Sequence, residues 1–348
     1  MTYSVSAISS VNEIPALLKS FADTLGYTTT TVSGTSVTVK HPTYTLAKVF
    51  TISALITGSA ETLRHRISVA CSAPGATAAI AESPKLNPTG VNNAASVVVS
   101  LPTKIHLIGK LAGGSSNPSE SFIAGVIEYG FNLYRHFYLG HIEKITAFDG
   151  GELTTGSAFQ VTGKSTRTVN YMDNGDTYYP FSANTNVNGD AGNGGAYINH
   201  VANAVPWRMF SSAAGVGGQT IDTFLATYGG AMILGGIKDG INTGYLACGK
   251  SPFAAAQVMA PVNLYIGKRI ASAQYFQAVG RAAGARMVNM EDLEPGVEVS
   301  VGTQLWRVFP VFSKTSAKST TYVINTPSNG FPPTNTSYFM GMAYKVSD

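Results

Sequence analysis

The stretch from Val297 to Pro310 reads Val-Glu-Val-Ser-Val-Gly-Thr-Gln-Leu-Trp-Arg-Val-Phe-Pro. Valine occupies every second position of its first part, and such alternation of apolar and polar residues is typical of a half-buried β-strand. Gly302 and Thr303 then form a two-residue turn, and residues 305–309 return as a second strand. Pro310 has no N–H to donate, so it ends the ladder or marks a sheet edge. The stretch predicts an antiparallel hairpin.

Outward from this hairpin, short runs rich in Val, Ile, Thr and aromatic residues recur along the chain, separated by Gly, Pro, Asn and Ser. The predicted strands cover residues 28–32, 37–40, 46–56, 66–70, 96–101, 104–109, 123–129, 133–139 and 338–346. Asp149-Gly150-Gly151 is a turn signal with strands expected on both sides. The expected fold class is mainly β, all-β or α+β, with antiparallel sheets in a sandwich-like arrangement and one N-terminal helix.

That helix is expected over residues 13–25, because apolar residues recur there at helical spacing and share one face. They are Ile14, Leu17, Leu18, Phe21 and Leu25. Gly26 follows the last of them and is expected to close the helix, since glycine readily takes the left-handed conformation of a C-terminal cap.

The start of the helix has two candidates. Ser10 and Glu13 match a capping box, but a helix that began there would place Pro15 inside its hydrogen-bonded turns. Asn12 as N-cap leaves Pro15 in the first turn, where no N–H is needed. We therefore expect the helix to start at Asn12.

The middle of the chain predicts a division into two domains. Residues 173–195 are rich in Asn, Gly, Asp and Tyr without any periodicity, which is typical of a long loop or a linker. We expect an N-terminal helix plus β-rich domain over 1–172, a Gly/Asn-rich loop or linker over 173–195, and a C-terminal β-rich domain over 196–348. One continuous β structure crossed by a long loop remains the alternative.

Charged residues make up 12% of the 348 residues, against about 25% in an average soluble domain. Hydrophobic residues make up 44%, so the chain has enough apolar content to fold. A surface this poor in charge suits burial between subunits, because few ions must lose their water there. A stable monomer with a hydroxyl-rich β surface is the alternative, and composition does not separate the two.

Several partners and sites are not indicated. The net charge is +4, and the basic clusters Arg64-His65-Arg66 and Lys268-Arg269 lack the interleaved aromatic residues of single-strand binders, so we expect no nucleic-acid partner. Cys71 and Cys248 lie far apart without a CxxC pair, which argues against a disulfide framework or a zinc site. We also expect no secretory signal peptide and no membrane span, since no apolar run reaches ~18 residues.

One motif would mean nucleotide hydrolysis if taken literally. Residues 244–251, Gly-Tyr-Leu-Ala-Cys-Gly-Lys-Ser, fit the phosphate-binding loop G-x-x-x-x-G-K-[ST]. The chemistry also needs a carboxylate at the end of a downstream apolar strand, to hold Mg²⁺. Here bulky Tyr and Leu occupy the loop, Pro252 follows directly and no such strand comes later. We predict no nucleotide site and no cofactor.

Carboxylates of one predicted β region could supply the acid and nucleophile of a glycosidase. They are Glu128, Glu143, Asp149 and Glu152. Ion-pair and turn roles explain Glu143-Lys144 and Asp149-Gly150 equally well. Among the histidines His136 and His141 are close, but five positions apart on a strand they face opposite sides, and residues 173–176 lack the full register of a calcium loop. We predict no catalytic residue and no metal ligand.

A set of turn and strand-end segments extends over most of the chain: residues 25–27, 134–144, 150–152, 286–290, 293–296, Gly302, 306–310 with Lys314, and 341–344. Together they resemble a signature of virion structural proteins of tailed bacteriophages. The resemblance rests on structural turns and strand ends and none of it is chemical. It therefore implies a part of a particle and no reaction.

Such a resemblance implies a non-enzymatic structural component, made in the host bacterial cytoplasm and built into the virion. The implied partners are copies of the chain in a ring-like homo-oligomer and other virion proteins such as tail tube, sheath or baseplate components. A tail or baseplate subunit is the first expectation. A head-to-tail neck or collar protein, and a host-surface or glycan-binding module, are the alternatives.

Overall fold

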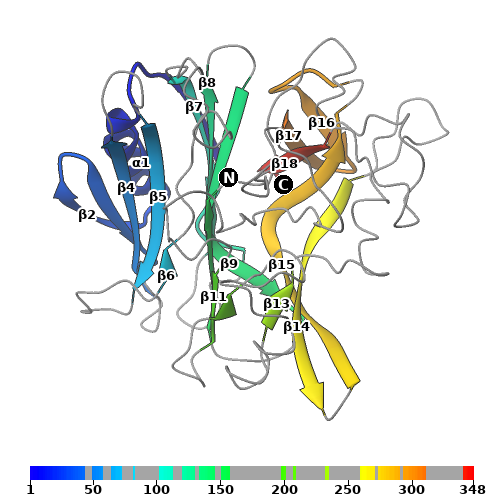
Figure 1. Cartoon of the computed structure of the whole chain (residues 1–348). Helices are drawn as coiled ribbons and strands as arrows, with labels where there is room; N and C mark the ends of the chain where they lie inside the picture. Colours follow the sequence, from blue (N-terminus) through cyan, green and yellow to red (C-terminus); the bar gives the residue numbers. More distant parts are fainter. Residues whose placement is uncertain are drawn as a thin grey trace, which may run out of the picture.

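The structure is a computed structural model of the chain. It describes residues 1–43, 49–57, 64–72, 81–82, 102–112, 120–129, 133–145, 150–156, 197–200, 207–208, 232–234, 259–270, 273–290, 293–310 and 340–348. Most of these residues belong to antiparallel β-strands, and one α-helix lies near the N-terminus (Figure 1). The predicted fold class is confirmed: mainly β, with antiparallel sheets and an N-terminal helix.

Five strands form the smaller sheet, in the order β2-β3-β4-β5-β6. They are β2 (Thr28–Ser33), β3 (Ser36–Lys40), β4 (Val49–Thr57), β5 (Arg64–Ser72) and β6 (Ala81–Glu82). Each strand pairs antiparallel with the next one in the sequence. The sheet is therefore a meander, and the β2–β3 hairpin lies at one side of the molecule (Figure 1).

Thirteen strands form the larger sheet, whose main path runs β1-β7-β8-β9-β15-β18-β17-β16. These strands are β1 (Thr2–Ala7), β7 (Pro102–Lys110), β8 (Phe122–Tyr129), β9 (Leu133–Lys144), β15 (Ala273–Asn289), β16 (Glu298–Val301), β17 (Gln304–Pro310) and β18 (Met340–Ser347). Off this path lie β10 (Gly150–Gly156), β11 (Tyr197–His200), β12 (Trp207–Arg208), β13 (Met232–Leu234) and β14 (Met259–Ile270). The hairpin predicted within residues 297–310 is β16 and β17, with Val301 opposite Gln304.

The helix α1 (Ile14–Leu25) begins after a 3₁₀ turn at Val11–Glu13, so the predicted start at Asn12 is wrong. Ser10 caps this turn: its Oγ accepts the N–H of Asn12 at 3.2 Å, and Glu13 Oε1 accepts the N–H of Ser10 at 2.9 Å. The added turn leaves Pro15 at the beginning of α1, where its missing N–H costs no helical bond. Gly26 ends the helix with φ 93°, as predicted.

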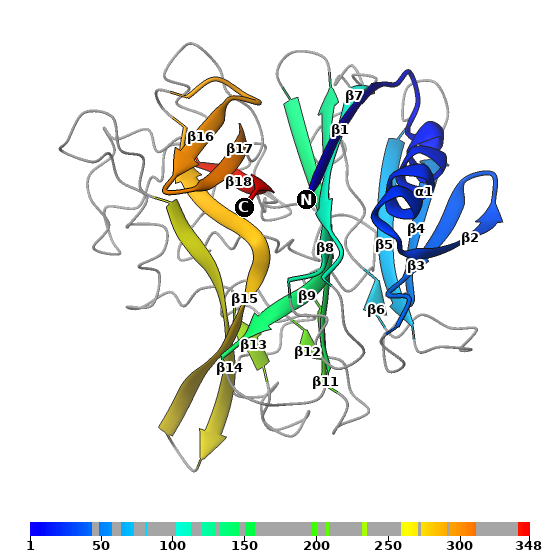
Figure 2. The ribbon, with the colours of Figure 1, turned by 180° about the vertical axis from the view of Figure 1, so that it is seen from behind.

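The central strands β7, β8 and β9 have one face covered by α1 and the smaller sheet (Figures 1 and 2). We call the buried cluster between them the helix-side core. It includes Ile14, Leu18 and Phe21 of α1, Val37, Val39, Phe50 and Ile52 of the smaller sheet, and Ile105, Leu107, Ile123, Phe137 and Leu139 of the central strands. A Cβ on Gly125 would lie 2.1 Å from the ring of Phe137. The glycine therefore leaves room for that ring against the sheet.

The other face of the central strands is covered by the larger sheet itself, because the sheet curls until β15, β17 and β18 lie over it (Figure 1). We call this second cluster the curl-side core. It includes Phe122, Ala124, Val126, Tyr138, Ala283, Met287, Phe309, Met342 and Tyr344. The rings of Phe122 and Tyr138 stack with centroids 5.9 Å apart. Both faces of the central strands are thus buried.

Ten strands overlap the predicted runs: β2, β3, β4, β5, β7, β8, β9, β16, β17 and β18. The strand predicted at 96–101 lies outside the described residues. The sequence missed β1 and the long hairpin of β14 and β15. Because β15 is rich in Ala and Gly, it lacks the alternation of large apolar and polar side chains that marks a strand.

Strands from both predicted domains share one sheet. β9 pairs with β15, with Glu143 opposite Arg281, and the curl-side core takes residues from both sides of the predicted boundary. The predicted linker at 173–195 lies outside the described residues, so the division into two domains stays a prediction.

Candidate functional site

The predicted group of carboxylates divides: Glu128 lies far along the sheet from Glu143, whereas Glu143 and Glu152 lie on neighbouring strands. Glu128 lies opposite Tyr134 on β9, and Glu143 is nine residues farther along that strand (143 − 134), which is about 30 Å at ~3.3 Å per residue. A glycosidase holds its two carboxylates about 5 to 9.5 Å apart. Asp149 lies outside the described residues. Glu128 and Glu143 are therefore too far apart to form such a pair.

Glu143 and Glu152 lie on neighbouring strands. Glu152 is opposite His141 and only 1% exposed. Glu143 forms an ion pair with Arg281 of β15, and its side chain is 29% exposed. The ion pair joins two strands that are far apart in the sequence, so it gives Glu143 a structural role.

His136 and His141 face opposite sides of β9, as predicted from their spacing. His136 lies on the curl side, where Nε2 donates to the carbonyl oxygen of Pro310 at 2.7 Å and Nδ1 accepts from the hydroxyl of Tyr344 at 2.9 Å. A carbonyl can only accept, so this arrangement assigns the proton to Nε2 of a neutral ring. The histidine thus ties β9 to both β17 and β18.

His141 lies on the other face beside His41, with ring centroids 6.0 Å apart and planes at 85°. Burial lowers the pKa of His141 to about 3, helped by His41 and Lys144. The sequence reasoning missed this pair, because nothing in the spacing of residues 41 and 141 shows that β3 and β9 stack. Within the described part of the chain, no cluster of three or more His, Cys, Asp or Glu could hold a metal ion.

A first polar cluster joins β1, β7 and β8 to β17; we call it the Tyr3 cluster. The hydroxyl of Tyr3 lies 2.9 Å from His106 Nδ1, and His106 Nε2 lies 3.5 Å from Glu128 Oε2. The guanidinium carbon of Arg307 lies 3.9 Å from the Tyr3 ring centroid. The rings of Phe309 and His106 pack together with their centroids 4.7 Å apart. The cluster therefore bridges the two layers where the sheet curls back.

Burial is the largest cause of the pKa shifts of His106 and Tyr3 in this cluster. It lowers the pKa of His106 against the opposing pull of Glu128, and it raises the pKa of Tyr3. A phenol that stays protonated is a hydrogen-bond donor and a poor nucleophile. The hydroxyl, imidazole and carboxylate of this cluster are thus suited to hold strands together.

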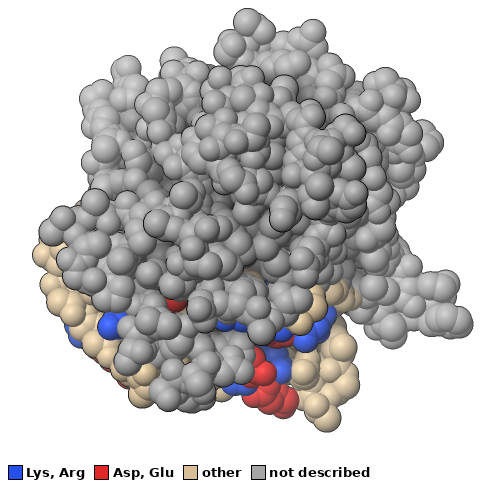
Figure 3. All heavy atoms as spheres, turned by 90° about the horizontal axis from the view of Figure 1, so that it is seen from below, with Lys and Arg blue, Asp and Glu red and all other residues tan. Residues whose placement is uncertain are grey.

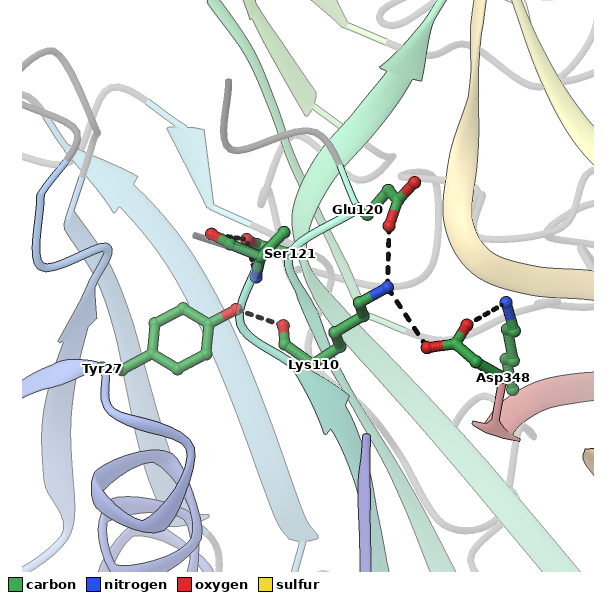
Figure 4. Close-up of polar contacts among 7 residues, drawn as sticks. Tyr27, Lys110, Glu120, Ser121 and Asp348 are labelled. Atoms are coloured by element: carbon green, nitrogen blue, oxygen red, sulfur yellow. Dashed lines mark hydrogen bonds and ion pairs between the residues drawn. The ribbon is translucent and has the colours of Figure 1, made fainter. Parts of the chain in front are cut away.

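A second polar cluster lies at the C-terminal end of β7, and we call it the Lys110 cluster (Figure 4). Lys110 Nζ lies 2.7 Å from Glu120 Oε2 and 3.5 Å from Asp348 Oδ2, and Lys345 Nζ lies 2.5 Å from Asp348 Oδ1. Hydrogen bonding to Glu120 raises the pKa of Lys110. Tyr27 donates to the carbonyl of Lys110 at 3.0 Å. The cluster ties β18 to the central strands.

Charges of both signs lie side by side where the described surface is visible from below (Figure 3). The ion pairs Lys19–Asp23 and Lys104–Glu128 show the same mixing. A phosphate-binding surface gathers one sign of charge over a face. The described residues in this view offer no such face.

Among the described residues, three of the five exposed large apolar side chains lie on strands that end a sheet, one on each strand; the other two, Ile145 and Val297, lie just after β9 and just before β16. Val5 on β1 is 50% exposed, Val32 on β2 is 61% exposed and Val301 on β16 is 41% exposed. β1 and β16 end the main path of the larger sheet, and β2 ends the smaller sheet. A terminal strand has main-chain groups without a strand partner on one side, so it can accept a further strand. Within the described part of the chain, these three edges are the strongest candidate for an interaction site.

No protein-family model and no curated protein matches the chain. The match to a phosphate-binding loop at 244–251, for which we predicted no nucleotide site, and the calcium-like turn at 173–176 both lie outside the described residues. Among the described helices, none is long and apolar enough to cross a membrane. The open edges and the two polar clusters therefore carry the functional inference.

Proposed function

We propose that the chain is a non-enzymatic structural subunit of a tailed-bacteriophage particle, built into the tail or baseplate. It acts through contacts with copies of itself and with other virion proteins. The observation that carries the proposal is that the described terminal strands β1, β2 and β16 each expose one valine, Val5, Val32 and Val301. Exposed apolar side chains beside main-chain groups that lack a strand partner favour protein association.

The composition supports the same function. With 12% charged residues, the surface can be covered by a neighbouring subunit with few ions to desolvate. Serine, threonine, asparagine and tyrosine can form neutral hydrogen bonds across such a contact. A subunit that spends its life inside a particle has little need of a charged surface for solubility.

The polar groups support a structural role over catalysis. Glu143 is paired with Arg281, His136 is bonded to Tyr344 and Pro310, and Glu128 lies about 30 Å along the sheet from Glu143. The contacts of Glu143 and His136 each join strands that are distant in the sequence. The resemblance of residues 134–144 and 306–310 to virion structural proteins adds the expected setting.

Electron cryomicroscopy of purified particles tests the proposal. We expect density in which the chain can be traced from Trp207, Trp306 and its aromatic strands, in several symmetric copies around the tail axis. Mass spectrometry of the same gradient-purified particles should detect its peptides at a matching copy number. Particles that lack both the density and the peptides would overturn the proposal.

A further inference from the structure

The sheet ends differ in how they are protected. Proteins blunt an open edge with a very short strand, a charge, a proline or a bulge. β6 has two residues, β16 carries Glu298 bonded to Arg307, and β1 lies beside the Arg307 guanidinium, which covers Tyr3. β2 has six residues, and none is charged or proline. Its register shift lies after Thr31, so residues 28–31 form a regular edge that none of these devices protects.

The main chain of β3 shows which residues of β2 face outward. Ala54 donates its N–H to the carbonyl of Thr35 at 2.8 Å. Residues of an antiparallel strand bond alternately to the two neighbours, so Val37, two positions after Thr35, also bonds to β4. Thr38, between such positions, bonds to β2.

Thr38 lies opposite Thr30, so Thr30 turns its main-chain groups inward to β3. The same alternation turns the main-chain N–H and C=O of Thr29 and Thr31 toward the open edge. Within the described part of the chain, β2 pairs with β3 alone. The edge therefore presents donors and acceptors in the spacing that a further strand needs.

The side chains of β2 match this edge. Five of its six residues are exposed, among them Val32 at 61%. The two charges on α1, Lys19 and Asp23, are paired with each other at 2.6 Å, and Thr29 donates to Asp23. Lys40 of β3 lies opposite Thr28, at the end of β2 away from Thr31. The stretch Thr29–Thr31 itself carries no charge.

We propose that β2 pairs with β2 of a second copy of this chain, antiparallel about a two-fold axis at Thr30. Thr29 then faces Thr31 of the second copy, so both outward-facing residues find main-chain partners. A two-fold contact brings identical residues together, and a strand without charge meets no like-charge repulsion there. The inference deepens the proposed function, on which it rests, by naming the surface that joins two copies.

Such a contact closes on itself as a pair, whereas a ring needs a different, heterologous contact. The β2 pairing thus adds a second kind of interface to the proposed assembly. It also joins the two smaller sheets into one continuous sheet of ten strands, twice the five of one copy.

Thr31→Pro tests the pairing in the full chain, with Thr31→Val as the matched control. Proline removes an N–H that faces outward, so the ladder with β3 is kept, while valine keeps the N–H and the shape. Analytical ultracentrifugation over a concentration series should show dimers for the wild type and for Thr31→Val. For Thr31→Pro we expect the dissociation constant to rise roughly 100-fold.

Val32→Lys is a second variant, which adds like charges near the axis and leaves the backbone unchanged. Circular dichroism and thermal unfolding check that each variant is folded. Wild-type protein that stays monomeric, or folded variants of both kinds that dimerise like the wild type, would overturn the pairing.

Particle composition separates this inference from the proposed function. If the chain is found in particles but Thr31→Pro leaves its dimerisation unchanged, the β2 pairing alone is overturned. If the chain is absent from particles but Thr31→Pro still abolishes its dimers, the virion role is overturned and the pairing is kept.

Discussion

The two faces of the central strands β7, β8 and β9 are buried by different means. The helix-side core is formed by apolar side chains from α1 and the smaller sheet. The curl-side core adds hydrogen bonds between strands distant in the sequence, such as His136 with Tyr344 and Tyr138 with the carbonyl of Ala283. Packing on the helix side thus depends chiefly on the volume of apolar side chains. Packing on the curl side depends also on the geometry of buried hydrogen bonds.

This difference teaches where specificity resides. Apolar contacts tolerate small shifts between layers, whereas a buried hydrogen bond fixes the position of its partners because leaving it unmade is costly. The bonds of His136 therefore set how β17 and β18 lie over β9. The helix side supplies stability, and the curl side supplies a single arrangement of the curled sheet.

Phe137→Ala should have the largest effect, because it removes a fully buried ring from the helix-side core. The ring also packs against the backbone of β8 at Gly125. Truncation therefore leaves a cavity beside a residue that has no side chain to fill it. We expect the free energy of unfolding to fall by about 4 kcal/mol, measured by urea denaturation. Phe137→Leu keeps much of the volume and should cost less than half as much; equal costs would mean that the core does not depend on volume here.

The two faces should also differ in how strongly they make stability depend on pH. His141 titrates near pH 6.5 when unfolded and has a pKa of about 3 when folded. Between these values the unfolded chain binds a proton that the folded chain does not, so stability falls as pH falls, by about 1.4 kcal/mol per pH unit. The pKa of His106 is lowered too, with the same sign, but Glu128 opposes the shift and makes its slope smaller.

Urea denaturation of wild type and His141→Gln at several pH values checks this. Relative to His141→Gln, the wild type should lose about 2 kcal/mol of unfolding free energy between pH 6.5 and pH 4.5. His106→Gln is the comparison on the curl side and should change the slope less. A constant difference across this range would show that His141 is not held neutral by burial.

Tyr344→Phe tests the polar geometry of the curl side. The variant keeps the ring and removes the hydroxyl that donates to His136 Nδ1 at 2.9 Å, so a buried acceptor loses its donor. We expect a loss of about 2 kcal/mol in the free energy of unfolding. A double-mutant cycle with His136→Phe should give a coupling of about 1 kcal/mol or more, and additive effects would contradict a specific bond.

Sequence reasoning reached the parts of this fold whose signals are local. The alternation of residues 297–301 and the turn at Gly302 predicted the β16–β17 hairpin, and helical spacing with Gly26 predicted α1. The cap failed because a 3₁₀ turn before α1 removed the conflict between Pro15 and the capping box.

The candidate site was largely beyond sequence reasoning. His41 meets His141 because layers stack, and Tyr3 meets His106 because β1 pairs with β7, about 100 positions later in the sequence. The spacing of His136 and His141 did predict opposite faces, since the two-residue period of a strand is local. The edge character of β2 depends on sheet order, which no single run of residues encodes.

The Lys110 cluster should contribute least, because its carboxylates are exposed: the side chain of Glu120 is 56% exposed and that of Asp348 is 60% exposed. We expect Glu120→Gln to lower the free energy of unfolding by about 0.5 kcal/mol at low ionic strength and by about zero in ~1 M salt, since water and salt screen such pairs. Lys19→Gln on α1 removes another exposed pair and serves as the control far from the curl. If Glu120→Gln instead costs as much as Tyr344→Phe and the cost survives high salt, the lysine is desolvated where the layers meet. The curl would then be fixed by both polar clusters as well as by the bonds of His136.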